Sequence, residues 1–582
     1  MAINVSPGVF TKIIDLSEYV RQVPSTIGFI PIICEKGPDN ELIFTNSVDF
    51  YTDFGEPNIN WAGSAYGQGP YVCDSFLRES DALYVIRCMP TDAAFANVTL
   101  IAEATSYGTD GTSNVTVGSE AGMNNFTEIN TLLIDDMTDA NNDGTDVAVM
   151  FYGAGRGEWY ENFKVRIAAH SNPSVAENGI YLLDIYKRQE DDDPETGLAD
   201  WGIILTLEVS FDPNSLDSAG DSLWIEDVVN TYSKDIKCKA SATLCTYLVT
   251  NGNCDWSEPF TITDSTDTGS GSYQFDNGSD GTLFDTNTGR ITTSVGDSLL
   301  TLAYTGLLPK ISKTEISDYL TVDEVLDTDD HYFTIVLDGG YSTNIKQGGI
   351  YVLVTTRKDC VALIDNGDNI SPNAAVTARD ATPFNTKYMA RYEPYSKVFD
   401  KFTGRDIWVT PVYHMANIVP YTDNVAELWF AAAGFNRATI GIIKDMRFSP
   451  RLADRDRFYL KQINPIVKFN VGYTMWGQLT TQSRPSALQD LNIIRLVLYI
   501  KRALEQFCKF FVFEQNDAIT WEQIGKNIRS FLTQIQNKRG LYSYSVEVGS
   551  TEYEIKQKKV HVNVILNPVR VIEQIHINLF IV

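Results

Sequence analysis

The stretch of this chain that comes closest to a ligand site is an acidic, amide-rich turn, Asp139-Ala140-Asn141-Asn142-Asp143-Gly144. Side-chain oxygens at alternate positions, followed by glycine, match the first half of a calcium-binding loop. Such a loop needs a bidentate glutamate six residues after the glycine, and Met150 stands there. The sequence therefore favours a turn at a domain boundary, with calcium binding as the alternative. A weaker version of the pattern is Asp276-Asn277-Gly278-Ser279-Asp280-Gly281.

Familiar catalytic motifs do not occur in the sequence. It has no Gly-x-x-x-x-Gly-Lys-Ser/Thr, no His-Glu-x-x-His and no Gly-x-Ser-x-Gly. Gly153-Ala154-Gly155-Arg156-Gly157 follows a strand pattern, but another strand pattern stands where a phosphate loop needs a helix, so a turn is predicted. Of the five histidines, His561 and His576 occupy the polar phase of strand patterns. We therefore expect no enzyme activity, no catalytic residues, no metal ligands and no cofactor.

The size and composition of the chain indicate a multi-domain globular protein. Its 582 residues are 43% hydrophobic and 12% aromatic, which is enough for three or four packed domains. No run of about 18 apolar residues occurs, and the first residues lack a secretory pattern, so we expect no membrane insertion and a cytosolic site of synthesis. The eight cysteines form no Cys-x-x-Cys pair, which predicts buried free thiols rather than zinc ligands or disulfides.

Charge is distributed unevenly along the chain. The formal net charge is −29, which argues against a nucleic-acid surface. Residues 421–582 hold 21 Lys and Arg against 14 Asp and Glu, whereas residues 1–420 hold 25 against 61. The distribution suggests acidic outer domains on a mildly basic C-terminal domain, and a merely solvated acidic surface is the alternative.

The strand and helix patterns predict an α/β and α+β multi-domain fold. Residues 1–22 are too short and too evenly alternating to bury both faces, which predicts an extended N-terminal arm. Residues 23–90 and 147–412 alternate strand and helix patterns and are expected to form one discontinuous α/β outer domain. Between them, residues 91–146 are crowded with Gly, Asp, Asn, Ser and Thr, which predicts a small inserted β-rich domain.

Residues 413–570 are expected to form an α/β C-terminal core domain with antiparallel end strands. An amphipathic helix is predicted over 486–511, and a second helix from the capping-box pattern Thr520-x-x-Gln523 to just before Gly540. Strand patterns follow at 542–548, 559–566 and 572–581, the last within a C-terminal arm of residues 571–582. The strand-like arms at both ends have the character needed to pair with sheets of other subunits.

Residues 511–524, FVFEQNDAITWEQI, resemble the FE-x-N-D…W signature of contractile tail sheath proteins, the subunits that ring the tube of contractile-tailed bacteriophages. Further motifs occur in the order of that family and span nearly the whole chain. They are Ser6-Pro7-Gly8, Gly157-Glu158-Trp159 with Asn162, Asn277-Gly278-Ser279-Asp280-Gly281, Asp359-Cys360-Val361-Ala362-Leu363, Thr422-Asp423, Trp429, Ala433-Gly434-Phe435-Asn436-Arg437, Ile463-Asn464-Pro465, Trp476-Gly477, Thr480 and Asn492-Ile493-Ile494-Arg495-Leu496.

The resemblance implies a structural, non-catalytic virion protein. Six copies form a ring, and rings stack helically around the tail tube. Contraction after host contact then drives the tube through the host envelope. The implied partners are further copies of the chain, the tail tube protein, and baseplate and tail terminator proteins, with assembly in the cytoplasm of the bacterial host. A sheath of a related contractile injector, such as an R-type bacteriocin or a type VI secretion system, is the alternative. A protein-binding module or a glycan hydrolase is a different class, and it would need paired carboxylates in an aromatic cleft.

Two groups of C-terminal residues are candidate site residues. Arg495, Arg502 and Lys509 are seven apart and lie opposite the apolar stripe of the first predicted helix. The family places this domain innermost, so they are expected to face an acidic tube, with a solvated helix face or salt bridges between subunits as the alternative. Glu514, Asn516, Asp517 and Trp521 are expected to be structural: the polar side chains satisfy the turn and helix start while the indole packs in the core.

Overall fold

The computed structural model of this chain describes residues 26–102, 115–133, 146–172, 175, 179–189, 200–251, 255–261, 272–286, 288–311 and 321–573. These residues belong to two compact units, a larger one, Thr26–Leu491, and a C-terminal one that begins at Asn492. The predicted arm of residues 1–22, the strand predicted over 572–581 and the Asp139–Gly144 turn fall wholly or almost wholly outside the described residues.

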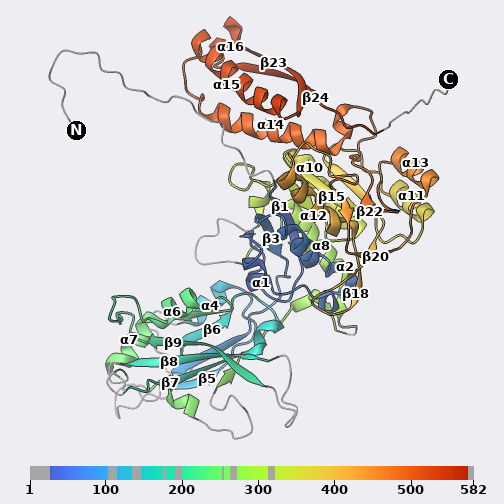
Figure 1. The fold of residues 1–582 in the computed structure, drawn as a ribbon. Helices are drawn as coiled ribbons and strands as arrows, with labels where there is room; N and C mark the ends of the chain where they lie inside the picture. Colours follow the sequence, from blue (N-terminus) through green and yellow to red (C-terminus); the bar gives the residue numbers. More distant parts are fainter. Residues whose placement is uncertain are drawn as a thin grey trace, which may run out of the picture. The chain divides into compact units, whose positions relative to one another are not determined.

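A nine-stranded sheet organises the larger unit (Figure 1), with the strands in the order β19-β22-β21-β16-β15-β14-β1-β3-β2. The six strands from β21 to β3 are parallel to one another. Numbered by their place in the chain, these six lie in the order 2-1-3-4-5-6, which defines a doubly wound α/β fold. The bounds are β1 Gly28–Ile32, β2 Ile43–Thr45, β3 Leu83–Arg87, β14 Ile335–Leu337, β15 Val361–Asp365, β16 Met389–Glu393, β19 Thr439–Ile440, β21 Asn464–Phe469 and β22 Gly472–Met475.

Helices cover both faces of this sheet, so β1, β14, β15 and β16 are buried along their whole length. On one face, Gly28 of β1 lies so close to Phe76 of α3 (Gly69–Leu77) that an added Cβ would be 2.9 Å from the ring. On the other face, Phe29 meets Tyr304 of α8 (Thr293–Thr305) edge to face at 5.9 Å. Helix α12 (Pro411–Val425) packs beside α3.

A fourth covering helix contains a π-helical turn. It runs through α9 (Thr343–Ile345), the π turn Lys346–Ile350 and α10 (Tyr351–Arg357). Gly349 allows a close approach to α8, because a Cβ there would lie 3.0 Å from Tyr304. The remaining elements around the sheet are α1 Asp49–Phe54, α2 Ile59–Tyr66, β12 Phe284–Asp285, β13 Arg290–Ile291, α11 Pro372–Ala381, α13 Leu452–Leu460, and the three-stranded sheet of β17 Ser396–Phe399, β18 Asp406–Val409 and β20 Ile443–Met446.

A second body of the larger unit lies between β3 and β12 in the sequence. Two four-stranded sheets, β10-β6-β4-β5 and β11-β7-β8-β9, share one hydrophobic core with α6 and α7. In that core Phe211 stacks on Trp256 with centroids 3.9 Å apart. The bounds are β4 Asn97–Ala102, β5 Val115–Gly118, α4 Phe126–Leu132, β6 Asp146–Gly153, β7 Phe163–Ala169, β8 Ile180–Arg188, β9 Trp201–Ser210, α6 Ile225–Tyr232, β10 Ile236–Ala240, α7 Ala242–Asn251 and β11 Tyr273–Gln274.

The boundaries differ from those expected from the sequence. The insertion expected over residues 91–146 ends inside a sheet, because β6 pairs with β4 on one side and β10 on the other. The boundary expected between residues 412 and 413 also falls within a sheet, since β16 pairs with β21. Composition marks where turns are dense, but which strands pair is decided by contacts between residues far apart in the sequence.

Two buried arginines join the two bodies of the larger unit. Arg87, the last residue of β3, donates to the backbone oxygens of Glu35 and Arg156 at 2.8 and 2.9 Å. Arg156 in turn pairs with the buried Asp39 at 2.7 Å. It stands in the bend after β6, where a turn was predicted, and an added Cβ at Gly155 would lie 2.1 Å from a backbone oxygen. The glycines of this motif therefore serve a close backbone approach.

The C-terminal unit consists of two long helices and a hairpin. Helix α14 (Leu491–Lys509) and helix α15 (Ala518–Asn537) precede β23 (Leu541–Gly549) and β24 (His561–Pro568), with α16 (Glu552–Lys556) in the connection. The predicted helices and the first two predicted strands are confirmed. The cap of the second helix differs, because Asp517 rather than Thr520 is the N-cap and accepts a bond from the Thr520 backbone N–H at 2.9 Å.

Candidate functional site

The hairpin of the C-terminal unit presents two strand edges that pair with no described strand. β23 and β24 form a two-stranded antiparallel sheet. One face of the hairpin packs on α15, where Tyr544 donates to the Arg529 backbone oxygen at 3.0 Å and Gln536 donates to the Tyr542 oxygen at 2.8 Å. A two-stranded sheet with open N–H and C=O groups along its edges is a template for strand addition.

The signature loop between α14 and α15 connects the helices to the hairpin. The Trp521 indole donates to Asn516 Oδ1 at 2.8 Å, and the Asn516 amide donates to the Lys559 backbone oxygen at 3.2 Å, next to β24. Backbone N–H groups at the start of α15 lower the pKa of the Asp517 carboxyl. Glu514 is exposed, and Trp521 is half-buried rather than in the core. Asn516, Asp517 and Trp521 thus make hydrogen bonds within this loop and to the start of α15, and the structural role of the four residues stays a prediction.

Trp521→Ala is expected to lower the free energy of unfolding of the C-terminal unit by about 1–3 kcal/mol, because a half-buried ring and one hydrogen bond are lost. Trp521→Phe keeps an aromatic ring but loses the indole hydrogen bond to Asn516, so it should cost about 1 kcal/mol. Chemical denaturation followed by circular dichroism measures both. Equal stability of the alanine variant and the parent would contradict this role for the indole.

The basic residues on α14 are not all exposed. Arg495 and Arg502 are 8% and 7% exposed, whereas Lys509 is open to solvent. The helix is buried around most of its first turns, because Asn492, Ile493 and Leu496 are buried as well. The expected open basic face is therefore reduced to Lys509 and the neighbouring exposed Lys501.

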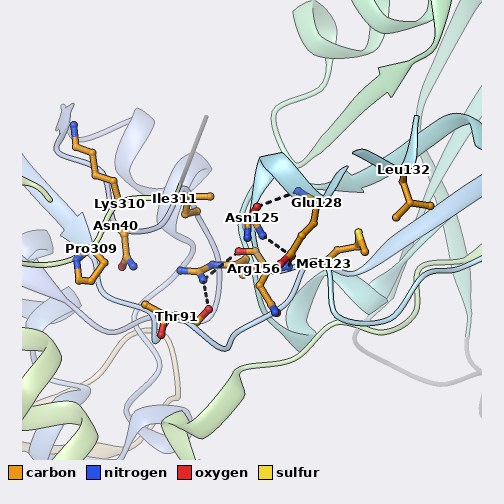
Figure 2. A pocket seen from close by; sticks show the side chains of 11 residues that line it. Asn40, Thr91, Met123, Asn125, Glu128, Leu132, Arg156, Pro309, Lys310 and Ile311 are labelled. Atoms are coloured by element: carbon orange, nitrogen blue, oxygen red, sulfur yellow. Dashed lines mark hydrogen bonds between the residues drawn. The ribbon is translucent and has the colours of Figure 1, made fainter. Parts of the chain in front are cut away.

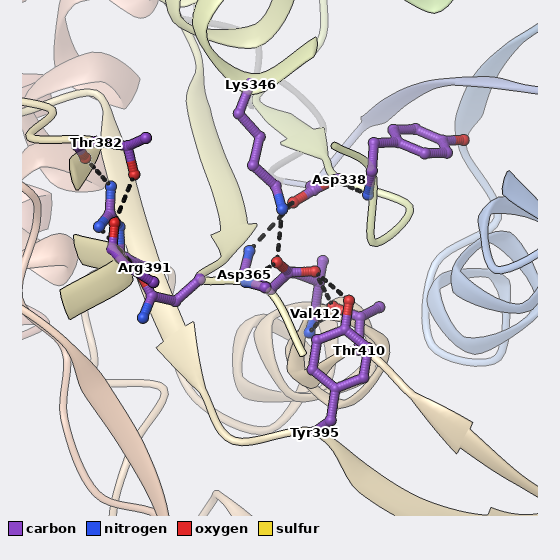
Figure 3. Close-up of polar contacts among 12 residues, drawn as sticks. Asp338, Lys346, Asp365, Thr382, Arg391, Tyr395, Thr410 and Val412 are labelled. Atoms are coloured by element: carbon purple, nitrogen blue, oxygen red, sulfur yellow. Dashed lines mark hydrogen bonds and ion pairs between the residues drawn. The ribbon is translucent and has the colours of Figure 1, made fainter. Parts of the chain in front are cut away.

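A cluster of ionisable side chains lies at the carboxyl edge of the nine-stranded sheet (Figure 3). Asp338 follows β14 and Asp365 ends β15, and the Lys346 ammonium lies 3.2 Å from Asp338 and 2.5 Å from Asp365. Asp365 also accepts bonds from Tyr395 and Thr410, each at 2.8 Å. The sequence analysis missed this cluster. An aspartate directly after each of two buried strand patterns was the available signal, since carboxyl ends of parallel strands meet at one edge.

The position of the cluster is where doubly wound proteins bind ligands, but its groups are closed off. Asp338, Lys346 and Asp365 are 0%, 4% and 1% exposed. Burial raises the pKa of Asp338 to about 6. Burial is also the largest single influence on Asp365, but the Lys346 ammonium and the hydrogen bonds from the Gly367 N–H and the Thr410 hydroxyl together lower the pKa of that carboxyl. Tyr341, in the loop after β14, is buried as well and donates to the Pro31 oxygen of β1 at 2.7 Å. We call this buried ion-pair cluster of Asp338, Lys346 and Asp365 the charge lock. Its groups stabilise the fold and are not open to a substrate.

A second pair with catalytic residue types is also buried. Ser396 Oγ lies 2.6 Å from His414 Nε2, and the two residues are 0% and 3% exposed. Burial lowers the pKa of His414 to about 3. A serine beside an imidazole is the beginning of a nucleophilic site, but a nucleophile must be reached by its substrate. We therefore assign the pair to the core.

A pocket of about 690 Å³ lies beside Arg156 (Figure 2). Its polar groups are engaged in the fold. Glu128 accepts the Asn124 and Asn125 backbone N–H groups at 2.6 and 3.3 Å, as part of the capping box of α4. Arg156 donates to Asp39 and to the Thr91 oxygen. These side chains therefore stabilise the fold: Glu128 caps α4, and Arg156 connects separate segments of the chain.

The loop that resembles a second calcium half-site connects the two bodies of the larger unit. Ala94 pairs with Ser279 and Asn97 with Asp276 in isolated antiparallel bridges. Burial raises the pKa of Asp280 to about 6.

Within the described ranges, no group of three or more His, Cys, Asp or Glu residues is arranged to hold a metal ion. Nor does any described helix have the length and hydropathy to cross a bilayer. The cysteines that the structure describes are thiols rather than disulfides, and all except the half-buried Cys508 are buried.

Solved structures with the same overall fold are tail sheath proteins. A sheath tail protein from Listeria innocua has a TM-score of 0.54 at 11% identity, covering 94% of this chain and 92% of that one. A sheath tail protein from Desulfitobacterium hafniense has a TM-score of 0.50 at 10% identity, covering 97% and 100%. At these identities the likeness concerns the fold, and it confirms the predicted mixed α/β multi-domain class.

Proteins with a similar amino-acid sequence are tail sheath proteins as well. Residues 483–581 match the family of phage tail sheath C-terminal domains, so the resemblance seen in the signature loop is confirmed for this part of the chain. The tail sheath protein of Vibrio phage KVP40 is 32% identical over 183 residues, and that of Enterobacteria phage T4 is 30% identical over 200 residues. These alignments cover 31% and 34% of this chain and 27% and 28% of the relatives, so the chain spans less than a third of their length.

Proposed function

We propose that this protein is a structural subunit of a contractile phage tail sheath. Copies assemble as stacked six-membered rings around a tail tube, and contraction drives the tube through the host envelope. The observation that carries the proposal is the C-terminal unit: its sequence matches the sheath domain family, and its hairpin offers two edges for strands of other copies. The sheath of a related contractile injector is the second candidate, since the same domain serves both.

A non-catalytic role is supported by the interior of the larger unit. Two groups there have catalytic residue types, the Lys346 cluster and the Ser396–His414 pair, and within each group the side chains are buried and contact one another. Assembly and contraction of a sheath need no bond-making chemistry, because a metastable polymer stores the free energy that contraction releases. The further partners in this proposal are the tube protein and the baseplate and terminator proteins. The finished particle is a virion tail, assembled in the cytoplasm of the host.

Fewer exposed basic residues than expected are available for the proposed tube contact. Lys509, with Lys501, is the exposed basic part of α14. Arg495 and Arg502 are buried and so position the helix rather than meet a tube. Contacts through exposed lysines are weak, roughly 0–1 kcal/mol each, and are screened by salt.

Electron microscopy of the purified full-length protein tests the proposal. We expect striated tubes, because each copy offers edges that other copies can extend. Removing residues 1–22 together with 571–582 should leave folded, soluble monomers that form no tubes, with circular dichroism reporting the fold. The matched control carries the same arm residues in scrambled order, which keeps length and charge but not the strand pattern. Tubes of normal length from the double deletion would contradict strand exchange through the arms.

A further inference from the structure

The β19 end of the nine-stranded sheet exposes a cluster of three aromatic rings. Phe435 lies 5.0 Å from Phe469 and 5.1 Å from Trp476, and Phe469 lies 4.8 Å from Trp476, measured between ring centroids. Phe435 is 46% exposed and Trp476 is 40% exposed. Backbone bonds brace the cluster, since Gly434 N–H donates to the Met475 oxygen and Trp476 N–H to the Pro465 oxygen. Rigid, exposed aromatic side chains of this kind are typical of the centres of protein interfaces.

Basic side chains surround this cluster. The Arg455 guanidinium lies 5.4 Å from the Phe469 ring centre, and the neighbouring Lys468 is exposed. Residues 435–476 contain eight Lys and Arg and three Asp. Of the eight, Lys444, Arg447 and Lys461 pair with aspartates outside this segment, so the positive excess that remains is small and Arg455 and Lys468 are its members beside the rings. We call the aromatic cluster with Arg455 and Lys468 the basic end. A partner for this surface should be acidic and should offer apolar groups.

The geometry of the rings favours a protein over a nucleic acid. Neighbouring ring planes are inclined by 53° to 72°. Bases stack on open, flat aromatic faces. Here each ring presents an edge to its neighbours, which suits side chains of a folded partner.

The opposite end of the same sheet, at β2, has the complementary character. On β2, Phe44 is 56% exposed, and its ring packs against Tyr84 of β3 at 5.0 Å. Tyr84 also meets His331 at 5.7 Å. The eight residues before His331, 323–330, contain five Asp and Glu, no Lys or Arg, and the 38% exposed Leu326. We call Phe44 with residues 323–330 the acidic end.

We propose that the basic end of one copy docks on the acidic end of the next copy, head to tail. The inference rests on the proposed function, because it requires self-assembly. Copies with a net charge of −29 repel one another, so contact forms where local charges are opposite. Since the two surfaces lie at opposite ends of one sheet, the contact is heterologous and adds copies in series instead of closing a pair.

Charge reversal at one end and then at the other tests the proposal. Arg455→Glu with Lys468→Glu makes both ends acidic. Asp323→Lys with Asp329→Lys and Asp330→Lys leaves two acids against three lysines in residues 323–330 and so makes both ends basic. Each of these two variants alone should stay folded and fail to form tubes. An equimolar mixture of the two should recover tubes, because acidic-ended and basic-ended copies can alternate. The variant with all five changes should also assemble, since its ends are reversed but complementary.

The matched control is Arg290→Glu with Arg405→Glu, two exposed positions away from the basic end that change the net charge equally. It should assemble like the parent. In addition, Trp476→Ala should raise the protein concentration needed for tubes by about tenfold or more while the far-ultraviolet spectrum stays unchanged.

The outcomes separate the docking contact from the proposed function. A parent that forms tubes, together with charge variants that each form them equally well, would overturn the docking contact alone. So would a mixture that stays monomeric, or a parent whose basic end binds a single-stranded oligonucleotide and loses that binding on Trp476→Ala. A parent that never assembles would contradict the proposed function and the docking contact with it.

Discussion

Lys346→Ala is expected to lower the free energy of unfolding of the larger unit by about 3–5 kcal/mol, because it leaves two buried carboxylates without their cation. Asp338 and Asp365 approach the Lys346 ammonium at 3.2 and 2.5 Å, and all three residues are fully buried. A water molecule in the space left by the side chain could hydrogen-bond these carboxylates but would not neutralise their charge. Denaturant-induced unfolding measures the loss.

The chain offers a matched control for that substitution. Lys461 pairs with Asp380 at 2.8 Å on the surface, where both side chains are exposed by more than a third. Lys461→Ala removes the same group in the same way but should cost only about 0–1 kcal/mol. Adding Asp338→Asn and Asp365→Asn to the Lys346 variant should recover part of the loss. Equal effects at Lys346 and Lys461 would contradict the role of the charge lock.

His414→Gln is expected to make the protein more resistant to mild acid. Burial lowers the pKa of His414 from 6.5 to about 3. Between these values the unfolded chain binds a proton that the folded chain does not, so this residue makes stability fall as the pH falls from about 6.5 towards 3. At about 1.4 kcal/mol per pH unit, the contribution reaches about 2–3 kcal/mol at pH 4.5.

The test compares the effect of the substitution on the free energy of unfolding at two pH values. The free energy of unfolding is determined for parent and variant at pH 7 and at pH 4.5. The variant should gain about 2–3 kcal/mol on the parent between the two, whatever the glutamine costs at pH 7. His561→Gln, which removes an exposed imidazole beside Glu554, should change much less. A pH-independent difference at His414 would show that the folded protein accommodates the charged imidazole.

Local patterns in the sequence were enough for most elements. The helix over α14 follows from apolar residues at three- and four-residue spacing, and the strand patterns at 542–548 and 559–566 correspond to β23 and β24. The signature FE-x-N-D…W also identified the domain to which residues 483–581 belong. Each of these signals lies within a short window of sequence, and side-chain periodicity carries it.

Tertiary structure decided which residues meet. Nothing local links Asp338, Lys346 and Asp365, yet parallel strand ends and a π turn bring them together. Likewise Arg495 and Arg502 have a polar position on a helical wheel but are buried, because a wheel does not show what packs against it. The domain boundary expected at residue 146 is another case, because β6 pairs with β4 and β10 and so continues a sheet across it.

The sequence by itself therefore determined the class of fold, the helices and strands of the C-terminal unit, and the resemblance to tail sheath proteins. These depend on residue periodicity and on motifs that a single stretch of chain contains. Only the tertiary structure decided the strand order, the burial of the ionisable groups and the opposite character of the two ends of the large sheet. Such properties depend on pairings across hundreds of residues, where the free energy comes from packing and charge complementarity that no local pattern encodes.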